Sequence, residues 1–254
     1  MDIREDVWLG RVFGHAVFKL EGLPREPGIG WTAARRALGE HIGQQARAMY
    51  YAKLDTADVQ TARHVAAAGA YVVDVNVMLA RRPRPPVTVA APAGCAVREF
   101  RPEDSGDVLD VATTCFQYSR FHLDPLVPAP VANRIKHDWI LNYIRGQRGD
   151  RLFVALAEGR PVGFLAALVS DGGDQRVSTI DLVGVGKPFQ GRGLGAALVA
   201  AFVEHYRSSC ELLQVGTQAA NIPSMRLYEK LGFEMARTQY VMHLHVQDRR
   251  VREP

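Results

Sequence analysis

Hydrophobic and polar positions change their period along the chain, and this change predicts a protein built from both strands and helices. Apolar residues alternate with polar ones along Val177–Val185, which is typical of a half-buried strand. After a glycine-rich stretch, Leu194, Leu198 and Phe202 recur at helical spacing. The pattern therefore predicts a strand, a short loop and an amphipathic helix in direct succession.

The same reasoning divides the C-terminal part of the chain into alternating elements. The turn Glu158–Pro161 separates two strand patterns, which predicts a hairpin. The predicted strands are Ala96–Phe100, Leu152–Ala157, Val162–Val169, Val177–Val185, Glu211–Thr217 and Phe233–His243. The predicted helices are Glu103–Phe116, Val131–Ile144, Leu194–Tyr206 and Pro223–Leu231.

The N-terminal part reads as a smaller α/β unit. Val7–Leu20 contains strand material interrupted by Gly10 and Gly14, and Gly69 supplies a helix stop. Helices are predicted at Trp31–Gln45 and Thr56–Ala68, and strands at Ala46–Leu54 and Tyr71–Leu79. Its helix–glycine–strand order resembles that around Gly232, with Val65 where Tyr228 stands. We interpret the unit as a degenerate half-copy, although coincidence explains the likeness nearly as well.

Four prolines fall between Arg81 and Gly94, and this composition predicts an extended, semi-rigid connector. The predicted organisation is therefore an N-terminal α/β domain at residues 1–80, a linker at 81–94 and a larger domain at 95–254.

The glycine-rich stretch carries the most specific chemistry. Glycines at the start of a helix let backbone N–H groups converge on one point, where the helix dipole favours an anion. Lys187 and Arg192 add positive charges beside it, so we expect the loop to bind a pyrophosphate. The alternative is a tight turn before a surface helix. A P-loop fits poorly, because the loop ends in Gly-Leu-Gly rather than Gly-Lys-Ser/Thr.

Two sequence blocks resemble the GNAT superfamily of acyl-CoA N-acyltransferases. Gln190, Gly193 and Gly195 match the positions of the family motif Gln/Arg-x-x-Gly-x-Gly/Ala. The segment from Asn221 to Phe233 resembles the family's Asn…Leu-Tyr-x-x-x-Gly-Phe block. The resemblance covers roughly residues 96–244 and implies an α+β fold, with a mixed, mostly antiparallel central sheet flanked by helices.

The resemblance also implies a site for acetyl-CoA and a direct attack of an amine on its thioester. Tyr228 matches the family's general acid, which protonates the departing thiolate; the alternative is a core tyrosine. Asn221 is either a ligand of the coenzyme arm or the N-cap of its helix, or both. The residues expected to bind the cofactor are Leu182, Val183, Gly184, Val185, Gln190, Gly191, Arg192, Gly193, Leu194, Gly195, Ala196 and Asn221.

The loop after the first helix of the larger domain is the predicted acceptor site. Arginine, histidine and aspartate stand there among aromatic residues, and the expected substrate-binding residues are Tyr118, Arg120, His122 and Asp124. The segment resembles GNAT members that acetylate a nucleotide-linked 4-amino-4,6-dideoxyhexose. The alternative is a surface loop whose aromatic residues cap the core. The general base is left open between His122, Asp181 and water.

Composition narrows the function classes only a little. A net charge of +4 suits anionic small ligands such as nucleotide sugars, and no basic run indicates nucleic acid. No apolar stretch is long enough to span a bilayer, and the first residues lack a secretory pattern, so we expect a cytoplasmic protein without a membrane partner. Three scattered cysteines suggest neither disulfides nor a metal site.

Three functions stay open at this point: an acetyltransferase of an amino-deoxy sugar nucleotide, a GNAT enzyme for another small amine or a peptide N-terminus, and a non-catalytic acyl-CoA-binding module. A homodimer is one of the oligomeric states that the sequence leaves open.

Overall fold

The computed structural model describes residues 1–24, 28–172 and 175–254, and within these ranges the chain divides into two compact units. Unit 1 comprises residues 1–76, 118–132 and 237–254, and unit 2 comprises residues 77–117 and 133–236. The units are not the predicted ranges 1–80 and 95–254, because the chain enters unit 1 three times.

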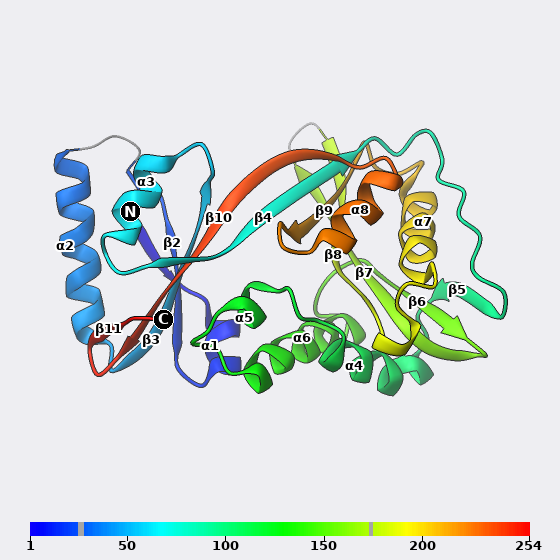
Figure 1. The fold of residues 1–254 in the computed structure, drawn as a ribbon, viewed down its shortest axis with the longest axis horizontal. Coiled ribbons are helices and arrows are strands. Elements are labelled where there is room, and N and C mark those ends of the chain that lie inside the picture. Colours follow the sequence, from blue (N-terminus) through cyan, green and yellow to red (C-terminus); the bar gives the residue numbers. More distant parts are fainter. Residues whose placement is uncertain (25–27, 173–174) are drawn as a thin grey trace. The chain divides into compact units, whose positions relative to one another are not determined.

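Unit 1 holds a short sheet with strand order β1-β2-β3-β10 (Figure 1). Strands β2 and β3 are parallel, and β10 runs antiparallel to β3. Its elements are β1 (Asp2–Glu5), α1 (Val7–Phe13), β2 (Ala16–Glu21), α2 (Ile29–Gln44), β3 (Arg47–Asp55), α3 (Val59–Ala66), the first part of β4 (Tyr71–Arg81), α5 (Arg120–Leu123), the second part of β10 (Glu234–Gln247) and β11 (Arg250–Arg252).

The core of unit 1 lies between this sheet and helices α2 and α3. Alternate residues of β10, Met242, Leu244 and Val246, pack with Trp31 of α2 and Val65 of α3. Because successive strand residues point to opposite faces, the intervening residues of β10 lie on the other side of the sheet.

The structure corrects the prediction for residues 7–20, where a helix, α1, precedes strand β2. The Asp6 side chain accepts a hydrogen bond from the backbone N–H of Leu9, and Gly14 ends the helix in the left-handed conformation. These two local caps favour a helix at a place where the apolar pattern alone suggested a strand.

Unit 2 holds the strand order β4-β9-β8-β7-β6-β5. All pairs from β5 to β8 are antiparallel, whereas β8 and β9 are parallel, so the predicted mixed and mostly antiparallel sheet is confirmed. Unit 2 includes the end of β4 and the start of β10. Its other elements are β5 (Cys95–Glu99), η1 (Pro102–Asp104), α4 (Ser105–Thr114), α6 (Ala129–Ile144, which begins in unit 1), β6 (Arg151–Ala157), β7 (Arg160–Gly172), β8 (Gln175–Val185), η2 (Lys187–Phe189), α7 (Leu194–Tyr206), β9 (Leu212–Gln218) and α8 (Ile222–Lys230).

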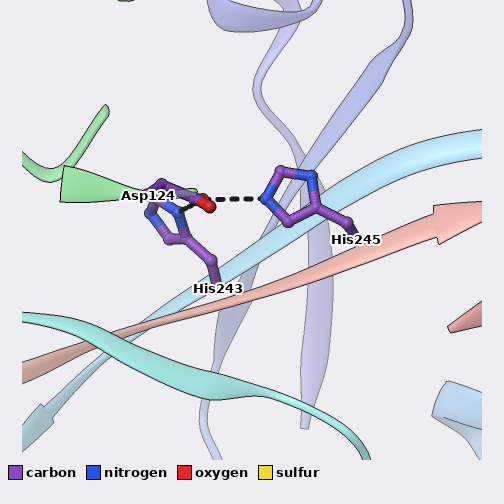
Figure 2. Close-up of side chains that lie close together, drawn as sticks. All are labelled: Asp124, His243 and His245. Carbon is purple, nitrogen blue, oxygen red and sulfur yellow. Dashed lines mark hydrogen bonds and ion pairs between the residues drawn. The ribbon is translucent and has the colours of Figure 1, made fainter. Parts of the chain in front are cut away.

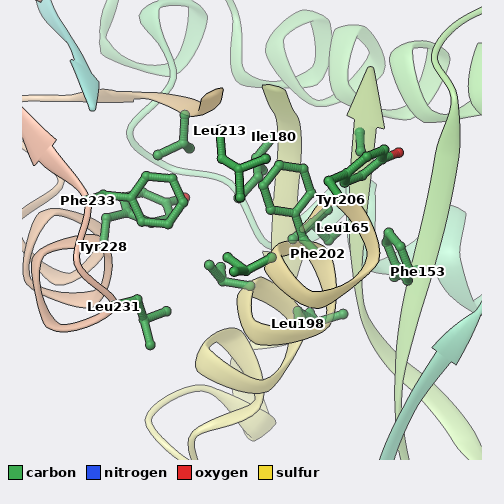
Figure 3. Packing of buried hydrophobic residues seen from close by; sticks show 14 of the residues in the cluster. Phe153, Leu165, Ile180, Leu198, Phe202, Tyr206, Leu213, Tyr228, Leu231 and Phe233 are labelled. Atoms are coloured by element: carbon green, nitrogen blue, oxygen red, sulfur yellow. The ribbon is translucent and has the colours of Figure 1, made fainter. Parts of the chain in front are cut away.

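Helices cover both faces of the unit 2 sheet. The cluster in Figure 3 joins Leu198 and Phe202 of α7 to Tyr228 of α8 and to strand residues such as Leu165 and Ile180. A second cluster on the other face packs α4 and α6 against β6, β7 and β8. The closing segment of the predicted linker also contributes, because Val87 and Val89 pack against the first cluster.

Candidate functional site

The glycine loop lies between β8 and α7 and leads into the first turn of α7. Gly193 is the N-cap of α7 with φ 89°, a conformation that favours glycine. The first backbone hydrogen bond of the helix runs from Ala197 N to Gly193 O, so the N–H groups of Leu194, Gly195 and Ala196 precede the helical ladder. This arrangement can hold an anion at the helix N-terminus.

The side chain of Gln190 stabilises the loop. Its Nε2 atom donates to the carbonyl of Val185 over 2.9 Å and so ties the loop to the end of β8. The guanidinium of the exposed residue Arg192 lies 5.4 Å from the ring centroid of Phe189. Residues 190–193 of the loop are exposed, whereas Leu194 is buried at the start of α7.

Strands β8 and β9 pair only at their beginnings. The parallel pairing runs from Val177–Leu212 to Ile180–Val215, while β8 continues to Val185 and β9 continues to Gln218. The last residues of β8 are thus paired with β7 on one side and not with β9 on the other. These are the residues Leu182, Val183, Gly184 and Val185 that are predicted to bind the cofactor arm.

Gly184 needs the absence of a side chain. A Cβ atom added at this position would come within 2.5 Å of the Cys115 sulfur and within 3.3 Å of the Phe164 ring. Burial raises the pKa of the Cys115 thiol to about 12, so the thiol stays protonated. Sequence analysis did not single out Cys115, because a lone cysteine at a helix end has no signal of its own.

A β-bulge in β8 lies just before this stretch. Ile180 pairs with Ala167 and Leu182 with Ala166, which leaves Asp181 as the extra residue. The Asp181 carboxylate accepts hydrogen bonds at 2.7 to 3.0 Å from Trp139, Tyr143 and Arg148. These donors hold α6 and the following loop against the bulge, so the structure gives Asp181 an anchoring role. Whether Asp181 also acts as the base stays open.

Tyr228 lies in the core cluster of unit 2, on the helix that follows β9. Its side chain is 2% exposed, and its ring meets that of Phe233 with centroids 5.9 Å apart (Figure 3). Burial raises the pKa of the phenol well above its usual value, so Tyr228 remains a proton donor at neutral pH.

Helix α8 is fixed at both ends. The Asn221 side chain accepts a hydrogen bond from Ser224 N over 3.3 Å, which makes it the N-cap. At the other end, Arg81 donates to the carbonyls of Leu231 and Pro85, each over 2.5 Å. Arg81 was not recognised as a site residue from the sequence, although it joins the start of the linker to the helix that carries Tyr228.

The predicted acceptor loop belongs to unit 1. Tyr118, Arg120 and His122 are half-buried, and the guanidinium of Arg120 lies 4.1 Å from the ring centroid of Tyr51. The ring of His122 is hydrogen bonded through Nδ1 to the Ser119 hydroxyl over 2.6 Å. These three side chains keep some exposed surface, so a role in binding a substrate stays a prediction for them.

Asp124 is buried in a hydrogen-bonded cluster (Figure 2). Its carboxylate accepts from Tyr71 over 2.6 Å, from His243 over 2.6 Å and from His245 over 2.8 Å. Burial acts to raise the pKa of Asp124, but these hydrogen bonds outweigh it and hold the pKa well below the usual range. With 2% exposure, Asp124 shapes the acceptor loop from inside and offers little surface to a ligand.

The same cluster has the composition of a metal site, because one donor atom from each of Asp124, His243 and His245 lies within 4.8 Å of the others. Two observations indicate that hydrogen bonds, and not a metal ion, connect these three side chains. Both histidines already bond to one oxygen of Asp124, and Arg120 lies 3.3 Å from His243 Nε2. Since a guanidinium only donates, Nε2 of His243 accepts and its Nδ1 carries the hydrogen that reaches Asp124. The absence of a metal stays a prediction.

Comparison with known proteins finds a match to one family model. Residues 110–233, just under half of the chain, match the model of the acetyltransferase (GNAT) family. The match includes the glycine loop and Tyr228.

Two curated relatives each match more than half of the chain. The spore coat polysaccharide biosynthesis protein SpsD of Bacillus subtilis is 29% identical over 150 residues, which are 58% of this chain and 50% of SpsD. A mycothiol acetyltransferase of Pseudarthrobacter chlorophenolicus is 30% identical over 148 residues, 57% of this chain and 44% of that protein. The chain thus spans about half the length of the curated relatives it matches.

Solved structures support the fold over most of the chain. A GCN5-related N-acetyltransferase from Sphaerobacter thermophilus superposes with a TM-score of 0.63 at 17% identity, covering 91% of this chain and 73% of that one. A tandem GNAT protein of the clavulanic acid biosynthesis pathway gives a TM-score of 0.59 at 17% identity, covering 90% of this chain and 75% of that one.

None of the described helices has the length and apolar character needed to cross a membrane.

Proposed function

We propose that the chain is an N-acetyltransferase that moves the acetyl group of acetyl-CoA to the amine of an amino-deoxy sugar nucleotide. The observation that carries the proposal is the combination in unit 2 of a glycine-capped helix, a strand pair that separates after four residue pairs and a buried tyrosine on the next helix. The first holds an anion, the second admits an extended arm, and the third donates a proton.

In this proposal, the pyrophosphate of acetyl-CoA rests on the N–H groups at the start of α7. The thioester lies along Leu182–Val185, whose free strand edge offers N–H groups to the carbonyl oxygen. The neutral amine attacks the thioester carbon, a C–N bond forms and the C–S bond breaks. Backbone donors stabilise the oxyanion, Tyr228 donates to the departing thiolate, and the proton lost by the amine goes to water or another base.

The nature of the acceptor is proposed from the predicted acceptor loop and from the curated relatives. Arg120, with Tyr118 and His122 nearby in the sequence, offers a cation and rings of the kind that bind phosphates and sugars. The similarity to a protein named for spore coat polysaccharide biosynthesis points in the same direction. We therefore propose an acceptor of the TDP-4-amino-4,6-dideoxyhexose type, such as TDP-fucosamine. The similarity to mycothiol acetyltransferases supports a second candidate, the acetylation of another small amine.

The test is a reaction of the purified chain with acetyl-CoA and TDP-4-amino-4,6-dideoxygalactose, followed by release of free thiol and by the mass of the product. We expect one acetyl group on the sugar. The matched control is the same nucleotide sugar with a hydroxyl in place of the 4-amine, which should give only background thiol release. Acetylation of polyamines or peptides, but not of the amino sugar, would favour the second candidate and refute the first.

A further inference from the structure

Unit 1 contains a polar pocket of about 840 Å³ at the place where its two parallel strands separate. Pairing of β2 with β3 ends at Lys19 and Tyr51, while β2 continues to Glu21 and β3 to Asp55. The volume lies within the range of small-molecule sites. The walls are formed by the ends of β2 and β3, the start of α3 and two residues of β10, Arg237 and Gln239.

The carboxylates that line this pocket already form hydrogen bonds or ion pairs with other groups of unit 1. Glu21 bonds to Lys19, and Asp55 lies 3.6 Å from Arg237 Nε and accepts from Ala57 N over 3.0 Å. Asp58 accepts from the backbone N–H of Thr61 over 3.1 Å as the N-cap of α3. Negative charge at the pocket is therefore engaged with neighbouring groups.

Lys53 is a further cation in the lining of this pocket. Its ammonium group lies within electrostatic reach of the carboxylate of Asp74. Burial lowers the pKa of Lys53 to about 8, and the nearby charges of Arg120, Lys19 and Arg237 act in the same direction. Asp74 opposes this effect without cancelling it. A bound anion would relieve the repulsion among these cations.

The backbone of unit 1 repeats parts of the arrangement of unit 2. In each unit a parallel strand pair holds four residue pairs and then opens. The following helices, α2 and α7, both begin after a glycine with positive φ, 134° at Gly28 and 89° at Gly193. The N-caps of α3 and α8 agree closely, with φ −88° and ψ 63° at Asp58 and φ −86° and ψ 64° at Asn221.

The sequence before α2 repeats the spacing of the glycine loop as well. Arg25, Gly28 and Gly30 follow the pattern of Gln190, Gly193 and Gly195. Residues 25–27 lie outside the described part of the chain, so the repeat is carried there by sequence alone.

Unit 1 has no counterpart of the Tyr228 hydroxyl at the matching position. Val65 stands seven residues after the N-cap of α3 and four before the left-handed Gly69, as Tyr228 stands between Asn221 and Gly232. Valine has no proton to donate, and Val65 is 3% exposed in the apolar core. Unit 1 therefore lacks the proton donor that is proposed for the transfer in unit 2.

We propose that the pocket between β2 and β3 is a second, non-catalytic site that binds the diphosphate of a nucleoside diphosphate, with Lys53 as its main cation. Two molecules carry this chemistry, the ADP portion of coenzyme A and the nucleoside diphosphate of a nucleotide sugar. The proposal does not require the transfer reaction to be the one proposed above.

Isothermal titration of the full chain with TDP, ADP and inorganic pyrophosphate, each without acetyl-CoA, tests the site. We expect Lys53→Gln to weaken binding of at least one nucleoside diphosphate tenfold or more, and Lys53→Arg to retain most of it. The matched control is Arg36→Gln, which removes one positive charge from α2 outside the pocket lining. Stronger binding of TDP than of ADP would identify the nucleotide sugar as the source, and the reverse would identify coenzyme A.

The proposed coenzyme site of unit 2 could also bind these nucleotides and mask the result. The titrations are therefore repeated in Gly193→Val, which should weaken binding in unit 2 and leave the Lys53-dependent binding in place. The proposal is overturned if neither nucleotide binds, or if Lys53→Gln, shown by circular dichroism to be folded, binds both within twofold of the unmodified chain. Because the readout is binding alone, a failure to acetylate an amino sugar has no bearing on it.

Discussion

His243 donates a hydrogen bond from Nδ1 to the buried carboxylate of Asp124 over 2.6 Å, although the two residues are 119 positions apart in the chain. Asp124 belongs to the predicted acceptor loop, directly after α5, and His243 lies near the end of β10. This bond and the hydrogen bond from His245 connect residues 118–132 to strand β10 within unit 1. The placement of the loop therefore depends on the protonation states in this cluster.

The cluster predicts a loss of stability in mild acid. Burial, together with the charge of Arg120, lowers the pKa of His243 to about 4, against 6.5 in an unfolded chain, although Asp124 opposes this change. Between these values the unfolded state binds a proton that the folded state does not, so stability falls as the pH drops from 6.5 to 4. We expect a loss on the order of 3 kcal/mol, measured by urea unfolding at several pH values.

The comparison variant for this measurement is His243→Gln. It should be less stable at pH 7, but its stability should depend less on pH between 6.5 and 4. Identical pH slopes for the two proteins would show that His243 does not carry the effect.

Tyr228→Phe tests proton donation to the thiolate. The turnover number should fall about 10²–10⁴-fold, while the Michaelis constants change little, because the hydroxyl acts in the transition state. Tyr206→Phe is the matched control: it removes a hydroxyl from the same core cluster, where the hydroxyl binds Asp150 over 2.5 Å. That variant should lose stability and keep its turnover. Near-native turnover of Tyr228→Phe, with chemistry rate-limiting, would assign the proton to another donor.

Gly193→Val should weaken coenzyme A binding severely in calorimetry. The substitution places a β-branched side chain at φ 89° and crowds the start of α7, where the phosphate is expected. Gly159→Val is a fitting control, since Gly159 has φ 82° in the turn between β6 and β7. It should cost similar stability without affecting the coenzyme. Equal affinity in both variants would remove the loop from the site.

Arg120→Ala and His122→Ala address the acceptor. Both should raise the Michaelis constant for the amine and leave acetyl-CoA affinity unchanged, because the donor site is built from unit 2. His137→Ala, a change on helix α6, serves as the control. Parallel losses of donor and acceptor binding would indicate misfolding, and no loss in either variant would exclude the loop from substrate binding.

Metal analysis of the purified chain should find less than about one tenth of an equivalent of zinc, because hydrogen bonds and Arg120 occupy the surroundings of Asp124. Activity should survive dialysis against a chelator. Stoichiometric zinc that is lost in Asp124→Asn would show that the cluster is a metal centre.

Local signals explain most of what the sequence predicted. Glycine spacing at residues 191–195, the Asn221 cap and the alternation along β8 act within a few residues, and these features reappear in the structure at the expected places. At residues 7–20 the apolar pattern suggested a strand, whereas the caps at Asp6 and Gly14 favour a helix. The structure has the helix. The family resemblance rested on the same short-range blocks.

The sequence by itself determined the strand–loop–helix of the glycine motif and the helix that bears Tyr228, because caps and periodicity are properties of neighbouring residues. Tertiary structure alone decided that Asp124 meets His243 and His245, that Asp181 is held by Trp139, Tyr143 and Arg148, and that β10 ends in unit 1 beside β3. Such contacts join residues tens to hundreds of positions apart. Their energies depend on burial and on partners that no local pattern encodes.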